Sequence, residues 1–230
     1  MKKLVIVLTI LALAAPAFAV SPNVRISQVY GGGGSTSTTP TPAFNQDYVE
    51  LYNASNTAVN IGGWTIEYAS ATGSWGSSAA NIFTFPAGTL IQPCSYVLVG
   101  GAWLATYTGA SITPDFAGLF AASATGGKFA LFNAVNTNLA CGLELPGTLV
   151  DKLSYGTTTN CAEGTLLGLL STVTAALRNQ GGYVDTDNNL ADFTIGTPAP
   201  RTSHSPINLD CGLPVATESE SWGSLKSSYR

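Results

Sequence analysis

Side chains that offer ligand oxygens alternate in one short stretch near the end of the chain. They are Asp185, Asp187, Asn189 and, just beyond them, Asp192. Oxygens at i, i+2 and i+4 begin an EF-hand calcium loop, but Leu190 stands where that loop has its glycine, and Gly196 where it has its glutamate. Short Asp and Asn side chains also cap turns by accepting bonds from backbone amides. Both interpretations stay open, with the turn favoured; calcium at these four residues is the one cofactor we consider, and otherwise we expect none.

No group of residues has the spacing of a catalytic site. Asp47 and Glu50 suggest the carboxylate pair of a glycosidase, but residues three apart in a strand point to opposite faces. Glu50 is instead expected to accept hydrogen bonds from backbone or from an arginine. His204, the single histidine, lies in a Pro- and Ser-rich stretch, whereas a catalytic imidazole must be held by packing. We therefore expect that the protein is not an enzyme.

Four consecutive glycines, residues 31–34, invite comparison with a phosphate-binding loop. The GK[ST] sequence of such a loop is missing, and no helical pattern follows. We interpret the glycine run as a flexible exit from a strand.

Three aromatic residues lie in segments that do not show a strand pattern. They are Trp75, Trp103 and Tyr107. Exposed aromatic rings on a rigid scaffold stack on sugars or contact a protein partner, whereas buried rings close the ends of a core. The sequence leaves both roles open.

The N-terminus has the three parts of a secretory signal peptide. Lys2 and Lys3 precede an apolar run at residues 4–15, and Ala17 and Ala19 supply the small side chains that a signal peptidase needs. The run is shorter than the roughly 20 residues that span a bilayer. We expect residues 1–19 to be removed, leaving a secreted, extracellular or surface protein with no membrane span.

Four cysteines in an exported chain predict two disulfides. They are Cys94, Cys141, Cys161 and Cys211. Cys141 and Cys161 flank a predicted strand at residues 149–155 and lie close in sequence, so we favour bonds 141–161 and 94–211. A zinc site is disfavoured because no pair has C-x₂₋₄-C spacing and the chain has one histidine.

The charge balance argues against a nucleic-acid partner. Without Lys2 and Lys3, seven basic residues remain against 13 acidic ones, a net charge of −6. Nonspecific affinity for DNA or RNA depends on Lys and Arg that displace counterions from phosphates. We expect no nucleic-acid binding.

Short segments of alternating polar and apolar residues recur along the chain and predict an all-β fold. They are residues 24–30, 47–53, 64–70, 82–85, 95–99, 128–133, 149–155 and 174–179. Turn formers separate them, which is typical of a sandwich or barrel. Residues 70–80 and 100–127 are predicted to be long loops, and residues 165–170 a single helical turn.

Several motifs in one order resemble the lamin-tail domain found in secreted and surface proteins of bacteria. They are residues 28–34, 47–53, 63–64, 126–131, 151–156 and the stretch from Arg178 through 185–189 and 192–193 to 200–201. The resemblance implies an immunoglobulin-like β-sandwich with long loops, and it supplies no catalytic mechanism. We expect this domain to span residues 20–211, before a linker and tail at 212–230.

The tail carries apolar residues at spacings of three and four. They are Trp222, Leu225 and Tyr229. One helical turn would place them on one face as a recognition tail, and a frayed terminus is the alternative.

Together these features predict a noncatalytic binding or structural module outside the cell, with a role in adhesion, the matrix or the cell envelope. Its partner would be a protein or glycan at the cell surface. The alternative is a secreted hydrolase, or the accessory domain of one, that acts on polysaccharide or phosphodiester.

Overall fold

The computed structural model describes residues 23–211. The predicted signal peptide at residues 1–19 lies outside the described residues. So do Trp222, Leu225 and Tyr229 of the predicted tail.

The larger of two main sheets has six strands in the order β12-β11-β1-β2-β7-β8. Its strands are β1 (Val24–Tyr30), β2 (Tyr48–Asn53), β7 (Tyr96–Gly100), β8 (Phe116–Ala117), β11 (Ala175–Arg178) and β12 (Phe193–Gly196). All its pairings are antiparallel except β7 with β8. A residue shift between Ile26 and Gln28 marks a bulge in the pairing of β1 with β2.

The second sheet has four strands in the order β10-β9-β4-β5, all antiparallel. They are β4 (Thr65–Ser70), β5 (Ile82–Thr84), β9 (Gly127–Phe132) and β10 (Leu149–Tyr155). A small ribbon pairs β3 (Val59–Asn60) with β6 (Leu90–Ile91). The helical turns are η1 (Ala79–Asn81), α1 (Asn179–Gly182), α2 (Asn189–Asp192) and η2 (Leu209–Cys211).

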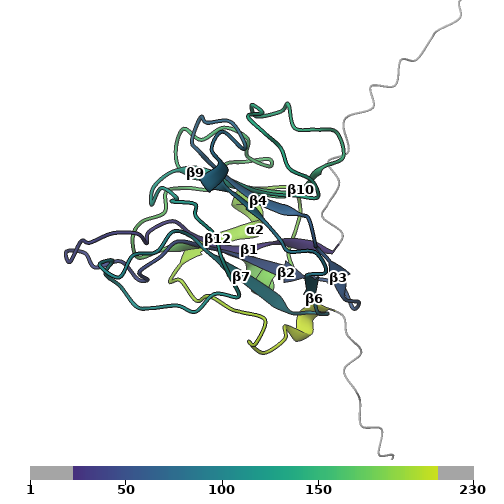
Figure 1. The fold of residues 1–230 in the computed structure, drawn as a ribbon, viewed down its shortest axis with the longest axis horizontal. Helices are drawn as coiled ribbons and strands as arrows, with labels where there is room; N and C mark the ends of the chain where they lie inside the picture. The colour runs from purple at the N-terminus through teal and green to yellow at the C-terminus, as the bar shows by residue number, and fades with distance from the viewer. Residues whose placement is uncertain (1–22, 212–230) are drawn as a thin grey trace, which may run out of the picture.

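The two sheets face one another, with β9, β4 and β10 above β1, β2 and β7 in the view of Figure 1. One apolar cluster contains inward side chains of both sheets, including Val49 and Leu51 of β2, Ile66 of β4 and Leu131 of β9. The period-2 alternation produces this arrangement because successive side chains of a strand point to opposite faces. The prediction of an all-β, immunoglobulin-like sandwich is confirmed.

The predicted strands are found within one or two residues of their expected bounds, but four short strands were not predicted. These are β3, β6, β8 and β12, each of two to four residues. The helical turn predicted at residues 165–170 is wrong, because Leu167 instead bridges Tyr155 at the end of β10. In residues 23–211, no helix has both the length and the apolar character needed to cross a membrane.

Both sheets are covered on their outer faces as well as on the faces that meet in the core. Every residue of β2 is buried. The C-terminal segment, residues 197–211, crosses the larger sheet, where backbone groups of Ala199 bond Gln28 of β1. On the smaller sheet the 133–148 loop covers the outer face of β4 and bonds Thr65 and Glu67 there.

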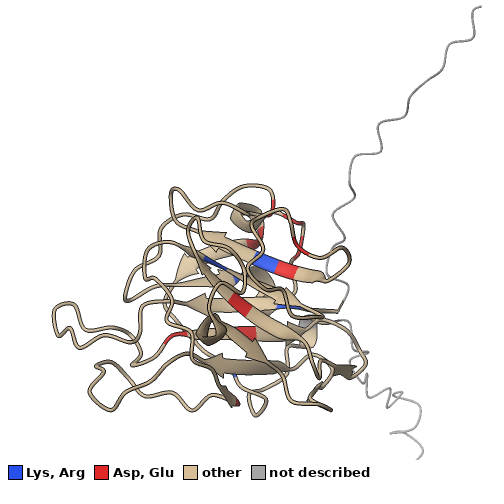
Figure 2. Cartoon of the chain, turned by 45° about the horizontal axis from the view of Figure 1, so that its top comes forward, with Lys and Arg blue, Asp and Glu red and all other residues tan. Residues whose placement is uncertain are grey.

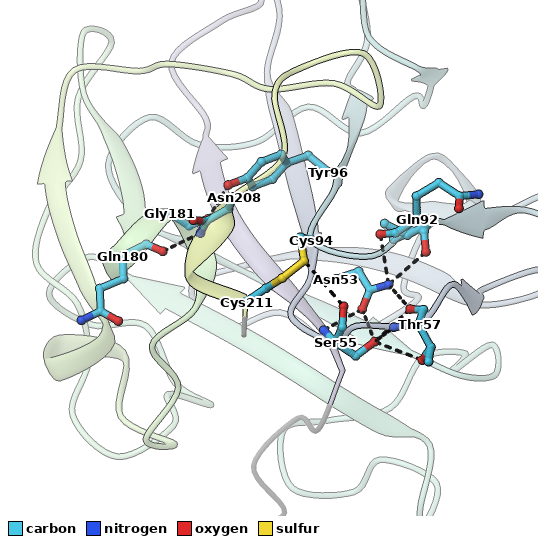
Figure 3. Close-up of a disulfide and its surroundings, with 11 residues drawn as sticks. Asn53, Ser55, Thr57, Gln92, Cys94, Tyr96, Gln180, Gly181, Asn208 and Cys211 are labelled. Carbon is cyan, nitrogen blue, oxygen red and sulfur yellow. Dashed lines mark hydrogen bonds between the residues drawn. A yellow bond between two sulfur atoms is a disulfide. The ribbon is translucent and has the colours of Figure 1, made fainter. Parts of the chain in front are cut away.

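The two predicted disulfides are confirmed. Cys94 joins Cys211 with a Cα–Cα distance of 5.6 Å, and Cys141 joins Cys161 at 5.4 Å, both usual separations. Figure 3 shows the first bond at the end of the C-terminal segment, where the side chain of Asn208 also bonds the carbonyl of Gln180. Each disulfide therefore ties down a segment that covers one outer face.

Candidate functional site

Trp75 is buried and does not belong to a binding surface. Its exposed fraction is 0%, its Nε1 donates to Glu144 at 2.8 Å, and its ring meets Phe132 edge-on at 5.8 Å. The Cys141–Cys161 disulfide packs in the same apolar cluster. Of the two roles left open by the sequence, the structure assigns packing to Trp75.

Trp103 lies on the surface, with an exposed fraction of 54%. It borders a pocket of about 290 Å³. The lining residues are Asn45, Gln46, Trp103, Ser111, Ile112, Pro114 and Ala117. Tyr107 is half-buried and is not among them, so the structure does not bring the two aromatic residues into one site.

The polar groups of the Trp103 pocket are amides and a hydroxyl. Asn45 donates through Nδ2 to Ser111 Oγ at 3.2 Å, and Gln46 donates through Nε2 to the carbonyl of Ile112 at 3.4 Å. The Oδ1 atom of Asn45 is buried and has no hydrogen-bond partner among the described residues. The backbone of Asn45 bonds Ala110, which fixes its loop against the 100–127 segment.

This lining combines an aromatic ring with neutral hydrogen-bonding groups. Such a combination suits an uncharged polar ligand, because the ring covers its apolar face and the amides bond its hydroxyls. The unpartnered acceptor of Asn45 is costly unless a ligand or solvent donates to it.

Asp47 and Glu50 point away from one another, as the strand spacing predicted. The carboxylate of Asp47 accepts the backbone N–H of Gly33 at 2.8 Å and of Ala122 at 2.7 Å. Burial raises the pKa of Asp47 to about 7. Glu50 accepts from Ser27 Oγ at 2.6 Å and forms an ion pair with Arg201 at 2.6 Å. Each carboxylate therefore has a structural partner, and they form no acid-base pair.

Residues 31–33 of the glycine run are packed and are not the flexible exit that we interpreted, whereas Gly34 is exposed and has a positive φ of 65°. A Cβ on Gly33 would lie 2.2 Å from the backbone of Gln46, and one on Gly31 would lie 2.5 Å from the carbonyl oxygen of Ser123. Glycine is needed there because neighbouring backbone comes too close for any side chain.

His204 lies beside Ser203 and Asp115, and this group has the residue types of a hydrolase triad. Ser203 Oγ donates directly to Asp115 Oδ1 at 2.6 Å, and the exposed fraction of the His204 side chain is 91%. A triad requires the imidazole to lie between the hydroxyl and the carboxylate. Because the carboxylate here accepts from the serine itself, the arrangement does not activate a nucleophile.

Three of the four predicted calcium ligands, Asp185, Asn189 and Asp192, have other partners in the structure. Asp192 accepts from Thr186 and from the backbone of Asn188, and Asn189 bonds both Ser154 and Lys152 of β10. They lie in the turn and in α2, at 185–192.

Arg178 supplies the positive charge at this turn. Its Nη1 lies 3.2 Å from Asp185 and 3.7 Å from Asp192. These contacts correspond to the alternative interpretation, a structural turn, while Asp187 is a half-buried carboxylate beside it.

A buried cluster of acidic residues that the sequence did not indicate adjoins this turn. Asp151 of β10 pairs with Arg178 at 2.7 Å, and Glu163 lies nearby with Asp185. Burial, and then the charge of Asp151, raises the pKa of Glu163 to about 9, and burial raises the pKa of Asp151 to about 6 despite Arg178. No local spacing could have revealed this cluster, because its acids come from three separate segments.

Comparisons with known proteins agree with this fold. The profile of the Lamin Tail Domain family matches residues 18–157, more than half of the chain. A solved DUF4876 family protein from Bacteroides thetaiotaomicron is similar at 12% identity with a TM-score of 0.50, over 82% of this chain and 74% of that one. At this identity the likeness concerns the fold alone. Comparison with curated proteins gives no match.

Proposed function

The chain belongs to the lamin tail domain family, and we propose that it works outside the cell as a noncatalytic module that binds a neutral glycan in the Trp103 pocket. The observation that carries this proposal is the half-exposed Trp103 ring beside the neutral polar side chains of Asn45, Gln46 and Ser111. The ring offers a stacking surface, and the amides and the hydroxyl offer hydrogen bonds to a sugar.

The extracellular location is supported by the predicted signal peptide and by two disulfides. Disulfides persist in oxidising compartments and are rare in the cytosol. Few charged side chains lie on the fold, and Figure 2 shows them scattered over strands and loops. A weakly charged surface suits an uncharged ligand better than an anionic one.

A glycan is favoured over a protein partner by the shape and lining of the site. Stable protein interfaces bury about 800 Å² on each partner, whereas this pocket of about 290 Å³ has the size of a small-ligand site. Adhesion or matrix attachment is the role that such binding would serve.

The noncatalytic assignment is supported by the contacts of the candidate acids and the histidine. Asp47 and Glu50 face separate partners, and His204 does not lie between Ser203 and Asp115. Ser203 Oγ also lies 3.2 Å from His204 Nδ1, but this imidazole is 91% exposed and is not held by packing as a catalytic one is.

The test is retention on immobilised neutral polysaccharides, followed by affinity measurements with soluble oligosaccharides of the retained type. We expect Trp103→Ala to weaken binding at least about tenfold, equivalent to about 1.4 kcal/mol. The matched control is Leu104→Ala, because Leu104 is the neighbouring side chain, is 55% exposed and does not line the pocket. Its affinity should equal that of the parent.

Two results would contradict the proposal. The first is equal loss of binding in both variants, or no retention of the parent on any neutral polysaccharide. The second is turnover of polysaccharide or phosphodiester substrates by the purified chain, which would favour the hydrolase alternative.

A further inference from the structure

Three carboxylates from separate segments converge beside the larger sheet, away from the Trp103 pocket. Asp151 lies on β10, Glu163 in the loop after β10, and Asp185 in the turn after α1. One oxygen of each lies within 4.8 Å of the others. A calcium ion binds oxygens at about 2.3–2.6 Å, so its ligands lie no more than about 5 Å apart. The spacing of the three oxygens meets this requirement.

Two of the carboxylates each have a buried oxygen that accepts no hydrogen bond. The side chain of Asp151 is 1% exposed. Its Oδ2 accepts hydrogen bonds from the backbone N–H of Ile26 at 2.6 Å and from Arg178 at 2.7 Å. Its Oδ1 has no hydrogen-bond partner among the described residues. Oε2 of Glu163 is likewise buried without one. Ionised carboxylates only accept hydrogen bonds, so neither acid can satisfy the other. Each unpartnered oxygen requires a proton or a cation.

The balance of charges around the site also favours a bound cation. Asp185 lies close to Asp151 and Glu163, Asp192 interacts with the same Arg178, and Asp187 interacts with Asp185 and Asp192, giving five acidic groups in this region. The basic groups that face them are Arg25, Arg178 and Lys152. Acidic groups therefore outnumber basic ones, and both guanidinium groups already form ion pairs with Asp185.

The position of Glu163 is set by the Asn-rich turn. Asn189 donates its backbone N–H to the carbonyl of Glu163 at 2.9 Å, and its Oδ1 accepts the backbone N–H of Glu163 at 3.3 Å and that of Ser154 at 2.9 Å. Glu163 is thus held against β10 by both sides of its peptide backbone. A fixed backbone that places an uncompensated carboxylate in the interior is typical of a built ligand site.

We propose that Asp151, Glu163 and Asp185 bind a calcium ion. The ligands are hard carboxylate oxygens, which Ca²⁺ accepts in flexible geometry and completes with carbonyl oxygens or water. This site shares only Asp185 with the four residues singled out by their spacing in the sequence. It goes beyond the proposed glycan binding and does not depend on it.

The test uses the full disulfide-bonded chain, stripped with EDTA and titrated at pH 8 with CaCl₂ alone in a calorimeter. The parent should bind one Ca²⁺ per chain and melt at a higher temperature when Ca²⁺ is present, because a ligand that binds only the folded state stabilises it. Glu163→Gln should weaken binding at least about tenfold, since affinity follows the number of charged ligands. The matched control is Asp187→Asn, which removes a half-buried acid of the same turn that is not among the three ligands and should change affinity less than about twofold.

Each other outcome overturns the proposal. If the parent shows neither binding heat nor a shift in melting temperature, Asp151 and Glu163 share a proton, and Glu163→Gln would then melt at or above the parent temperature. If Asp187→Asn loses as much affinity as Glu163→Gln, the ion binds at the exposed turn. Should Glu163→Gln fail to fold, Glu163→Asp replaces it, because a shortened carboxylate also cannot reach the ion; affinity equal to the parent would exclude Glu163 as a ligand.

Discussion

The two outer faces of the sandwich are covered in the same way but balanced differently. On the larger sheet, Glu50 lies under the C-terminal segment and is neutralised by Arg201, whose guanidinium also stacks on Tyr96 at 3.8 Å. On the smaller sheet, Glu67 lies under the 133–148 loop and accepts only from the backbone of Asn136 at 2.8 Å and from Thr65 at 3.3 Å. Its Oε2 has no hydrogen-bond partner among the described residues.

The difference teaches how a covering segment determines the cost of a buried acid. Burial raises the pKa of both acids, but at Glu50 the cation of Arg201 opposes the rise, whereas the neutral donors at Glu67 leave most of the desolvation cost in place. Burial therefore raises the pKa of Glu67 to about 7. The stability of the larger sheet's outer face should depend on the ion pair between Glu50 and Arg201, and that of the smaller sheet's outer face on pH.

The largest effect on stability should come from removing the disulfides that hold the two covering segments. In the chain-entropy model, the bond that closes 117 residues is worth about 5 kcal/mol and the one that closes 20 residues about 3 kcal/mol. We expect Cys94→Ser/Cys211→Ser to lose more unfolding free energy than Cys141→Ser/Cys161→Ser, as measured in urea. Equal losses of unfolding free energy would mean that the covering segments stabilise the fold by more than the loop entropy that each disulfide removes.

Next in size is the loss of the cation from the larger sheet. Arg201→Met leaves Glu50 buried and unpaired, which should cost about 3 to 5 kcal/mol at pH 7. The control is the double variant Glu50→Gln/Arg201→Met, which removes both charges and should recover much of the loss. Urea unfolding of the three proteins measures both effects; a single variant as stable as the parent would show that Glu50 does not need its partner.

A smaller effect, of opposite sign, is expected on the second face. Because the folded pKa of Glu67 is raised from 4.5 to about 7, its folded state holds the proton more tightly than the unfolded chain. That stabilisation is present below about pH 4.5 and is lost as the pH rises through about 7. Glu67→Gln should therefore gain on the order of 3 kcal/mol at pH 8 and little at pH 4.5.

The matched control for this variant is Glu50→Gln. It should be destabilised at pH 8, because Arg201 would lose its anionic partner. Thermal or urea unfolding across this pH range compares the two, and the same sign for both would remove the contrast between the faces.

The smallest effect should come from Trp103, which lies on neither covered face. Trp103→Ala should change the unfolding free energy by less than about 0.5 kcal/mol, since exposed side chains seldom stabilise the fold. A larger loss in urea unfolding would make Trp103 part of the packing, as Trp75 is, and weaken its assignment to a binding pocket.

The strands could be predicted because their signal is local. Residues 47–53 alternate in polarity, and β2 forms at Tyr48–Asn53. The disulfide between Cys141 and Cys161 was equally predictable, because the two residues are close in sequence. The short edge strand β12 was not, since three of its four residues are exposed or partly exposed and the strand depends on pairing with β11.

The candidate sites were predicted less well, for a physical reason. Trp75 and Trp103 both lie between strands, and only packing decided that one is buried and the other exposed. The turn at residues 185–192 was visible as a source of oxygens, but its contacts with Arg178 were not.

By itself, the sequence determined the all-β class and most strand positions and favoured the disulfide pairing that the structure has, because each depends on residue types and short-range periodicity. Only the tertiary structure decided which side chains are covered and by what. Glu50 and Arg201 are 151 residues apart, and Asp151 and Arg178 are 27 apart. Burial and charge depend on such distant partners, whose contacts form only when the sheets and their covering segments have packed.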